Sequence, residues 1–495
     1  MIYVADAIMG SGKTSAAINF MNSHPDRKYL YVTPYIDETS RILSACPSLN
    51  FIAPHAAAEF CGSKVRHTAC LLKEGYNITT THQAFKLYSQ DMKDDIRRLG
   101  YTLILDESLD TLSEINIPHD DINLFVESGY VEESAKGKYH CVKDSYAGRM
   151  YNEFFGVLCS RDIVRVGGKK NSPCFYWEFP PDLFAAFRDV YILTYMFKAQ
   201  NLSYLFDMTD TAYKYIYVNK TKDGYVFDEY NRYIPEYVYH IKDKLHILEN
   251  VRYNRVGDRF TALSESWFKN DNKLIPEVRD NVYNFFRNHS PSSTDRRLWS
   301  TYSCSKNILK GKGYTKRFLA FNTRATNDYS SSTHLAYCVN IFMNVGQKMY
   351  FRNNGVNVDE DAYALSTMVQ WIWRSAIRNG EEILIYLPSG RMRRILYEWM
   401  DSLESMNPDR EEYKARKELF ESIRVKTIKN SSMTAEDIVE FKEKENDAAE
   451  KKKQEKKKQQ AEKAKKRQKA KREREKRVHV PSDRYEIEFN KVRRK

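Results

Sequence analysis

The 495-residue sequence contains no run of about 18 uninterrupted apolar residues, the length that an α-helix needs to cross a bilayer. It also contains no basic start followed by an apolar segment, so we expect no secretory signal peptide. Its eight cysteines include no CxxC pair and are spread over a long chain, which is typical of reduced thiols rather than of a disulfide framework. These absences favour a cytoplasmic protein without a membrane partner.

Most of the chain also lacks an excess of positive charge. Residues 451–480 carry 16 Lys and Arg against 4 Glu, which accounts for nearly all of the formal net charge of +13. A nucleic-acid site in the rest of the chain therefore needs local clusters of Lys and Arg rather than bulk charge. The basic tail itself has three open interpretations: an auxiliary nucleic-acid contact, a solvated single helix held by Glu–Lys pairs, or a disordered segment.

Short apolar segments alternate with helix-prone segments over most of the chain. Strands are predicted at Ile2–Val4, Tyr29–Val32, Leu103–Leu105 and Val190–Leu193. Strands that alternate with helices predict an α/β fold with mostly parallel sheets, and a chain of this length exceeds what one core supports. We therefore expect two α/β domains and a charged tail: residues 1–205 with an insertion at about 111–180, residues 206–403, and residues 404–495, helical or disordered.

The second half shows the same alternation between residues 240 and 400. We expect helices at 272–288, 334–344 and 360–380, a strand followed by a loop at 317–329, and a strand followed by a helix at 381–400. This pattern predicts a second sheet that is also mostly parallel.

The segment AIMGSGKTS, residues 7–15, follows the first predicted strand and precedes a predicted helix. Glycines let backbone N–H groups approach anionic oxygens, a Lys binds the β- and γ-phosphates, and a Ser or Thr binds Mg²⁺. Ala7 replaces the usual first Gly of the GxxxxGK[ST] pattern. The alternative to a phosphate-binding loop is a turn that is rich in small residues by chance. We predict a nucleoside triphosphate site formed by Ala7, Met9, Gly10, Ser11, Gly12, Lys13, Thr14 and Ser15.

Two carboxylates, Asp106 and Glu107, follow the predicted strand Leu103–Leu105. Hydrolysis of a nucleotide needs one carboxylate to position Mg²⁺ and a second to orient or deprotonate the attacking water. We assign Asp106 to the metal, together with Thr14, and Glu107 to the water. An acidic pair after a strand is also a common strand end or helix cap, so the assignment depends on the sheet bringing the pair beside the loop.

Seven segments fall in the order of helicase motifs I, Ia, Ib, II, III, V and VI: AIMGSGKTS, YVTPY, ITTTH, LILDES, ILTYMF, FNTRATN and QWIWRSAIR. Over about residues 1–400 the chain therefore resembles superfamily 2 helicases, in particular the DEAD/DEAH-like helicases of phage and plasmid replication regions. Motifs I, II and VI are the specific ones, and Ala at the first loop position is normal in that family. The resemblance implies two RecA-like domains, ATP and Mg²⁺ as cofactors, and the cytoplasm of a bacterium or a phage-infected cell.

The same resemblance assigns roles to motifs III and VI. Thr194 stands where a Ser or Thr couples hydrolysis to movement, although a buried strand Thr is the alternative. Gln370 stands where a Gln lies by the γ-phosphate, and Arg374 and Arg378 stand where arginines neutralise the charge that develops during phosphoryl transfer. A spacing of four places all three on one helix face. The alternative is that this face is only a solvated surface of the helix. The family separates its two arginines by three residues, so the choice of arginine finger stays open.

Nucleic-acid contacts are expected at strand-to-helix turns, where backbone N–H groups and hydroxyls hold phosphates. They are Thr33, Pro34, Thr80, Thr81 and His82 in the first domain, and Arg324 and Thr326 in the second. Trp299, Trp371 and Trp373 offer stacking faces to bases or, as is more common for tryptophan, belong to the core. We expect DNA rather than RNA as the partner, with replication proteins binding through the tail.

Three functional hypotheses follow. The first is an ATP-dependent helicase or translocase that acts on DNA in replication or recombination. The second keeps the fold but makes the protein an initiator that binds a replication origin through its insertion or tail. The third is a phosphate-loop kinase or switch ATPase with an unrelated C-terminal scaffold. Arginines from residues 370–378 beside Lys13 would argue against the third.

Overall fold

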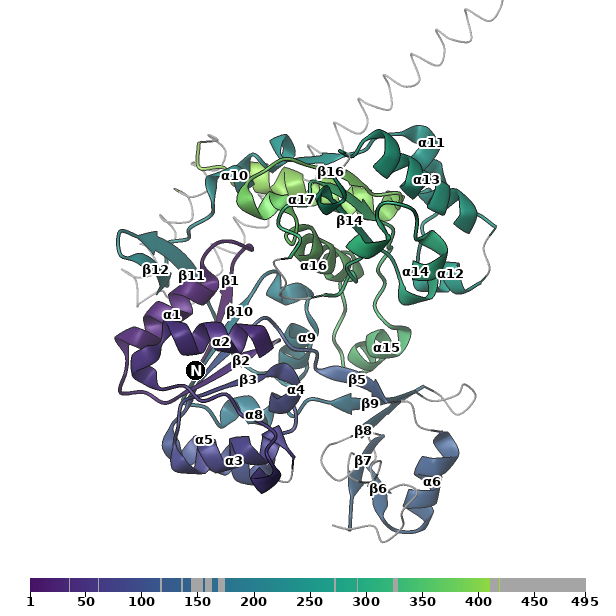
Figure 1. Cartoon of the computed structure of the whole chain (residues 1–495). Coiled ribbons are helices and arrows are strands. Elements are labelled where there is room, and N and C mark those ends of the chain that lie inside the picture. Colours follow the sequence, from purple (N-terminus) through teal and green to yellow (C-terminus); the bar gives the residue numbers. More distant parts are fainter. Residues whose placement is uncertain are drawn as a thin grey trace, which may run out of the picture. The chain divides into compact units, whose positions relative to one another are not determined.

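The computed structural model describes residues 1–409 and residue 418, except 35, 61, 116–117, 135–136, 144–154, 156–162, 168–173, 271–272, 292 and 324–327. Met1–Asn407 form one compact unit that holds both α/β domains (Figure 1), and a second unit begins at Pro408. Nearly all of the predicted tail therefore lies outside the described residues, and its three interpretations stay predictions.

The first domain is built on a seven-stranded sheet in the order β12-β11-β1-β10-β4-β2-β3. Its strands are β1 (Ile2–Asp6), β2 (Tyr29–Thr33), β3 (Ile78–Thr81), β4 (Thr102–Asp106), β10 (Asp189–Thr194), β11 (Lys214–Thr221) and β12 (Gly224–Asp228). Neighbouring strands run parallel except β11 and β12, which form an antiparallel hairpin at one edge. This hairpin lies beyond residue 205, so the sheet continues further along the chain than the domain boundary that the sequence predicts.

Helices cover both faces of this sheet, because its central strands are apolar on both sides. Helices α1 and α2 pack on one face, where Met21 and Ile42 belong to the same hydrophobic core as Tyr29 and Tyr31. Helices α3, α5, α8 and α9 belong to the core on the other face. The helices are α1 (Lys13–Ser23), α2 (Ile36–Ala45), α3 (Lys64–Glu74), α4 (His82–Phe85), α5 (Gln90–Leu99), α8 (Asp182–Ala185) and α9 (Asn201–Met208).

A separate antiparallel sheet occupies the predicted insertion between β4 and β10, in the order β5-β9-β8-β7-β6. Its strands are β5 (Leu112–Ile115), β6 (Val131–Glu133), β7 (Lys138–Cys141), β8 (Ile163–Val166) and β9 (Cys174–Glu178). Helix α6 (His119–Glu127) packs on it through Ile122 and Phe125. The insertion thus has a small core of its own.

The second domain is built on a four-stranded parallel sheet in the order β13-β16-β15-β14. Its strands are β13 (Leu245–Ile247), β14 (Arg297–Ser300), β15 (His334–Tyr337) and β16 (Ile383–Tyr386). Its helices are α10 (Glu236–Tyr239), α11 (Val251–Asn254), α12 (Glu265–Lys269), α13 (Ile275–Asn288), α14 (Ser303–Leu309), α15 (Val345–Asn353), α16 (Glu360–Ile372) and α17 (Gly390–Ser405). The predicted α/β class with two parallel sheets in tandem is confirmed.

Segments 317–329 and 334–344 of the second domain differ from the prediction. The helix predicted at 334–344 is wrong, because strand β15 lies there. Leu335, Ala336 and Tyr337 are fully buried in the middle of the sheet, and a continuous apolar run fits such a strand as well as a buried helix. The strand predicted at the start of 317–329 is also wrong, since only an isolated bridge from Phe318 to Trp299 forms; β14 takes that place beside β15.

The three tryptophans that we considered for base stacking lie in the core of the second domain. Trp299, Trp371 and Trp373 are each at most 1% exposed, and Trp371 Nε1 donates a hydrogen bond to the Leu319 carbonyl at 3.1 Å. A buried ring offers no face to a nucleobase, so the core interpretation holds.

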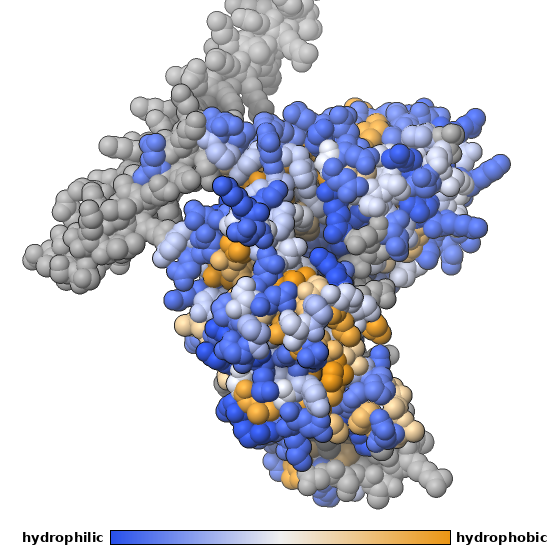
Figure 2. Space-filling model, turned by 60° about the vertical axis from the view of Figure 1, so that its left-hand side comes forward, coloured by the Kyte–Doolittle hydropathy of each residue, from blue (hydrophilic) through white to orange (hydrophobic). Residues whose placement is uncertain are grey.

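Within the part of the chain that the structure describes, no helix is both long enough and apolar enough to cross a bilayer. The face shown in Figure 2 is mostly hydrophilic, with apolar side chains gathered in small groups.

Helix α15 of the second domain packs against the insertion of the first (Figure 1). The Tyr350 hydroxyl donates to Glu178 Oε2 of β9 at 2.7 Å, and Gln347 Nε2 donates to the Leu112 carbonyl at 2.8 Å. Asn344 Nδ2 donates to Glu114 Oε2 at 3.1 Å. These bonds join the two domains directly.

Replacing Tyr350 by Phe should lower the free energy of unfolding by about 1–2 kcal/mol, because the buried Glu178 carboxylate loses a donor. Tyr397→Phe is a matched control: its hydroxyl donates to Glu249 at the same 2.7 Å, but the residue is 37% exposed, and we expect a change below about 0.5 kcal/mol. Chemical unfolding followed by circular dichroism measures both. Equal effects of the two substitutions would show that the hydrogen bond from Tyr350 to Glu178 adds no more stability than an exposed one.

Candidate nucleotide-binding site

The loop between β1 and α1 has the backbone geometry of a phosphate-binding loop. Gly10 and Gly12 adopt φ of +81° and +88°, in the left-handed region that favours glycine. Gly12 caps α1, and its carbonyl accepts a hydrogen bond from the Ala16 N–H at 2.8 Å. A Cβ at Gly12 would lie 2.2 Å from the Tyr225 ring, so a larger residue does not fit. The N–H groups of the first turn of α1 point out of its N-terminal end, where an anion binds.

Lys13, the first residue of α1, is folded back onto this loop. Its Nζ donates to the Ala7 carbonyl at 2.5 Å and to the Ile8 carbonyl at 3.2 Å. Burial lowers the pKa of Lys13, while the nearby carboxylates of Glu107, Asp106 and Asp6 act against this shift. The Lys13 ammonium is buried and its hydrogen bonds go to two neutral carbonyls, so an anion that enters the loop would give it a charged hydrogen-bond partner.

The two predicted carboxylates lie beside the loop. The Tyr31 hydroxyl donates to Asp106 Oδ2 at 2.9 Å. Burial raises the pKa of Asp106 to about 7, and the charge of Glu107 adds to the rise. Glu107 has φ of +62°, a left-handed conformation that is rare for a non-glycine residue, and its N–H donates to the Leu193 carbonyl at 2.9 Å. Such a conformation is typical of a functional position.

Residues from both domains line one cavity of about 280 Å³ around Lys13. The first domain supplies the loop and both acids, and the second supplies Arg374 and Arg378. Arg374 is only 9% exposed. Burial of Lys13 is the main cause of its lowered pKa, and the positive charge of Arg374 lowers that pKa further. The lining consists of Met9, Gly10, Gly12, Lys13, Thr14, Ser15, Pro34, Glu38, Arg41, Asp106, Glu107, Tyr225, Trp373, Arg374 and Arg378.

The predicted helix face of Gln370, Arg374 and Arg378 is wrong. Helix α16 ends at Ile372, whose carbonyl accepts from the Ser375 hydroxyl at 2.6 Å, a local bond that competes with continuation of the helix. Arg374 lies in the following turn, and Arg378 lies in the 3₁₀ helix Ala376–Asn379. Gln370 stays on α16 and lines a different, larger cavity. The structure therefore brings both arginines to Lys13 but separates them from Gln370.

Thr194, the last residue of β10, connects the loop with this larger cavity. Its carbonyl accepts from the Ala7 N–H at 3.0 Å, and its hydroxyl donates to Gln200 Oε1 at 3.0 Å. Gln200 Nε2 donates to the Tyr195 carbonyl at 2.8 Å, and Gln200 lines the larger cavity. Thr194 is buried, as the alternative interpretation expects, and its contacts also fit a coupling residue.

Sequence reasoning missed several residues that shape the site. The Asp6 carboxylate accepts from the Met196 and Phe197 N–H groups at 2.8 and 2.9 Å, which ties β1 to the segment after β10, and burial raises its pKa. Asp6 stands directly before the loop, so its position in the sequence could have marked it as a residue of the site. Tyr225 carries no such signal, because it lies far beyond motif III.

The predicted nucleic-acid residues are mostly enclosed. Thr33, Thr80 and His82 are buried, and His82 Nε2 lies 2.9 Å from the Asp106 carbonyl oxygen. Thr81 caps α4 by accepting from the Ala84 N–H at 3.4 Å. Pro34 lines the Lys13 cavity instead. These strand-to-helix turns are packed against the rest of the domain, so their side chains offer little surface to a nucleic-acid strand. Arg324 and Thr326 lie outside the described residues.

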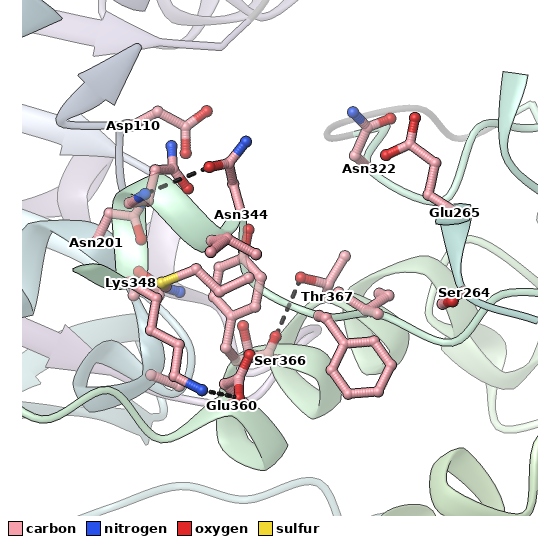
Figure 3. A pocket seen from close by; sticks show the side chains of 18 of the residues that line it. Asp110, Asn201, Ser264, Glu265, Asn322, Asn344, Lys348, Glu360, Ser366 and Thr367 are labelled. Atoms are coloured by element: carbon pink, nitrogen blue, oxygen red, sulfur yellow. Dashed lines mark hydrogen bonds and ion pairs between the residues drawn. The ribbon is translucent and has the colours of Figure 1, made fainter. Parts of the chain in front are cut away.

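The larger cavity has a volume of about 1200 Å³ and borders both domains. Asp110 and Asn201 come from the first domain, and Ser264, Glu265 and Asn322 face them from the second, with α16 between (Figure 3). Amide side chains are frequent in its lining, which also includes Lys348 and Arg352. Lys348 forms an ion pair with Glu360. The lining of the cavity therefore carries charges of both signs.

Comparisons with known proteins show the family to which the chain belongs. Residues 239–400 match the family model described as the YonV C-terminal Rossmann-like domain. The chain is also 36% identical, over 412 residues, to the SPbeta prophage-derived uncharacterized protein YonV of Bacillus subtilis (strain 168), a match that covers 81% of this chain and 99% of the relative. The chain belongs to the YonV family. The Rossmann-like domain of the YonV family thus contains the four-stranded sheet together with Arg374 and Arg378.

The chain is also similar to solved structures, among them the following two. One is described as the structure of S. tokodaii Xpd4, with 12% identity and a TM-score of 0.41, and the other as XPD_Helicase, with 9% identity and a TM-score of 0.46. Both matches cover 81% of this chain, and they cover 94% and 95% of the respective solved chains.

Proposed function

We propose that the chain is an ATP-dependent nucleic-acid helicase or translocase whose two α/β domains act on one nucleotide as RecA-like halves. One observation carries the proposal: Lys13, Asp106 and Glu107 of the first domain line the same cavity as Arg374 and Arg378 of the second. A nucleotide gripped from both domains favours their closed arrangement, and its hydrolysis removes that grip. A kinase or switch confined to the first domain has no need of these arginines.

The residues present fit ATP and Mg²⁺. The glycine cradle would be filled by a Cβ at Gly12, and the two carbonyl contacts of Lys13 are ones that phosphate oxygens can replace. Thr14 and Asp106 would hold Mg²⁺, which, when bound, neutralises phosphate charge. Ala7, Met9, Ser11 and Ser15 complete the loop.

Each side chain has a distinct task. Glu107 orients the attacking water and accepts its proton, since its carboxylate lines the cavity beside Asp106. Arg374 neutralises the charge that develops on the γ-phosphate, in a largely water-excluded position. Through its hydrogen bond to Gln200, Thr194 transmits the change from bound ATP to bound ADP to the larger cavity. This link couples hydrolysis to movement of the two domains.

The larger cavity is our candidate path for a nucleic-acid strand. It borders both domains, and its amides, Lys348 and Arg352 can hold phosphates and sugars without reading sequence. Tyr363, which also lines it and is half-buried, offers an aromatic contact to bases. The prophage origin of the YonV relative favours DNA over RNA, in a bacterial or phage-infected cell.

ATP hydrolysis by the full chain, measured with single-stranded DNA, duplex DNA and RNA, tests the proposal. We expect single-stranded DNA to raise the rate, and Lys13→Ala to lower the stimulated rate at least about 100-fold, because the β- and γ-phosphates lose their cation. Lys73→Ala, at an exposed position on α3, is the matched control.

Stimulated hydrolysis that survives Lys13→Ala would contradict the assigned site. Hydrolysis that no nucleic acid stimulates, together with phosphorylation of a small molecule, would favour the kinase hypothesis instead. Protection of one defined DNA sequence from nuclease would favour the origin-binding initiator.

A further inference from the structure

Tyr225 lies on the phosphate loop although it is more than 200 residues away in sequence, on the edge hairpin of β11 and β12. Its ring is so close to Gly12 that an added Cβ would come within 2.2 to 2.5 Å of three ring atoms. The residue is half-buried and is one of those that line the Lys13 cavity. A flat aromatic surface therefore borders the nucleotide cavity, and none of the roles assigned above uses it.

Both the backbone and the ring of Tyr225 are held by neighbouring groups. Asn19 Nδ2 of α1 donates to the Tyr225 carbonyl at 2.9 Å, which ties β12 to the helix that follows the loop. Strand β11 pairs in parallel with β1, so the hairpin extends the sheet that carries the loop. Tyr233 packs edge-on against the Tyr225 ring, with centroids 5.8 Å apart. An aromatic side chain fixed in this way loses little freedom when a ligand packs on it.

The order of strands places this ring at the end of the cavity away from the acids. Strands β10 and β4, which lead to Asp106 and Glu107, lie on one side of β1, and β11 and β12 lie on the other. The γ-phosphate belongs beside the acids, because hydrolysis takes place there. A triphosphate that runs across Gly12 from that side leads its sugar and base toward Tyr225. Aromatic rings stack on nucleobases in a way that tolerates different bases.

We propose that Tyr225 is the surface on which the base of the bound nucleotide stacks, with two-ring purines binding more tightly than pyrimidines. The proposal deepens the function above and rests on a nucleoside triphosphate occupying the Lys13 cavity. Stacking depends on the ring and not on the hydroxyl, so Phe should replace Tyr225 and Ala should not.

Isothermal titration calorimetry of the full-length protein, with Mg²⁺ and either ATP or inorganic tripolyphosphate, tests the proposal. Tripolyphosphate carries the phosphate chain but no base. We expect Tyr225→Ala to weaken ATP binding about 10-fold or more and to leave tripolyphosphate binding within about 2-fold, whereas Tyr225→Phe keeps both. CTP should lose less affinity than ATP on Tyr225→Ala. Tyr230→Ala, at an exposed tyrosine after the same hairpin, is the control.

Two results would overturn the proposal. Equal loss of ATP and tripolyphosphate binding on Tyr225→Ala would mean that the ring only supports the loop, and unchanged ATP binding would mean that the base lies elsewhere. Lys13→Ala separates failure of this proposal from failure of the proposed function. The substitution should weaken the binding of both ATP and tripolyphosphate. If it weakens the binding of neither, the nucleotide site itself is wrongly placed.

Discussion

Arg374→Ala should slow nucleic-acid-stimulated ATP hydrolysis about 10³-fold while changing ATP affinity by less than about 3-fold. The guanidinium lies across the cavity from Lys13 and is 9% exposed, so its field is weakly screened. Charge develops on the transferring phosphoryl group only in the transition state, and a cation that meets this charge acts on rate rather than on binding. Steady-state kinetics and direct nucleotide titration measure the two quantities.

Arg378→Ala should have a smaller effect than Arg374→Ala, because Arg378 is more exposed and solvent therefore screens its charge more strongly. The structure therefore favours Arg374 as the finger. Arg279→Ala, on the exposed face of α13 where it pairs with Asp280, is the control and should leave the rate unchanged. An unchanged rate for Arg374→Ala, or an equal loss of rate and affinity, would contradict a transition-state role.

Asp106→Asn should stabilise the metal-free protein at neutral and alkaline pH while abolishing its hydrolysis. Burial raises the pKa of Asp106 to about 7, whereas the ordinary value is 3.8. Between these values the folded state keeps a proton that the unfolded state releases, so the stability of the folded state falls as pH rises through this window. The loss reaches about 4 kcal/mol at most above pH 7. Asn does not ionise, and its amide oxygen still accepts from the Tyr31 hydroxyl.

Thermal unfolding from pH 4 to pH 8 in the presence of EDTA measures this effect. The gain in Tm of Asp106→Asn over the unsubstituted protein should be near zero at pH 4, grow up to pH 7 and stay level above it. Asp26→Asn, at an exposed aspartate, should give no pH-dependent gain. A gain that is the same at every pH would show that the charge of Asp106 is not its source.

The phosphate loop and the acidic pair were predictable because their chemistry is local. Two glycines, a lysine and a flanking strand and helix determine the loop within fifteen residues, and a buried strand places Asp106 at its end. Strand β15 was not predictable in the same way, since a fully buried run carries neither a two-residue nor a 3.6-residue period. Only the surrounding layers decide between strand and helix there.

Residues that act through tertiary contacts also escaped sequence reasoning. Arg374 and Arg378 line the Lys13 cavity, but not as members of one helix face, because the Ser375 hydroxyl bonds to the Ile372 carbonyl where the helix was expected to continue. The enclosure of Thr33 and His82 depends on packing that no local pattern records. Tyr225 reaches Gly12 only because β11 pairs with β1, a contact between distant parts of the chain.

The most direct test of a nucleotide shared between the two domains is a crystal structure of the full chain with ADP, aluminium fluoride and Mg²⁺. We expect the fluoride group to lie between the Lys13 amine and the Arg374 guanidinium, within hydrogen-bond distance of both, and Lys13 to have left the Ala7 and Ile8 carbonyls. Fluoride held by the loop alone, with Arg374 turned toward other protein groups, would contradict this expectation.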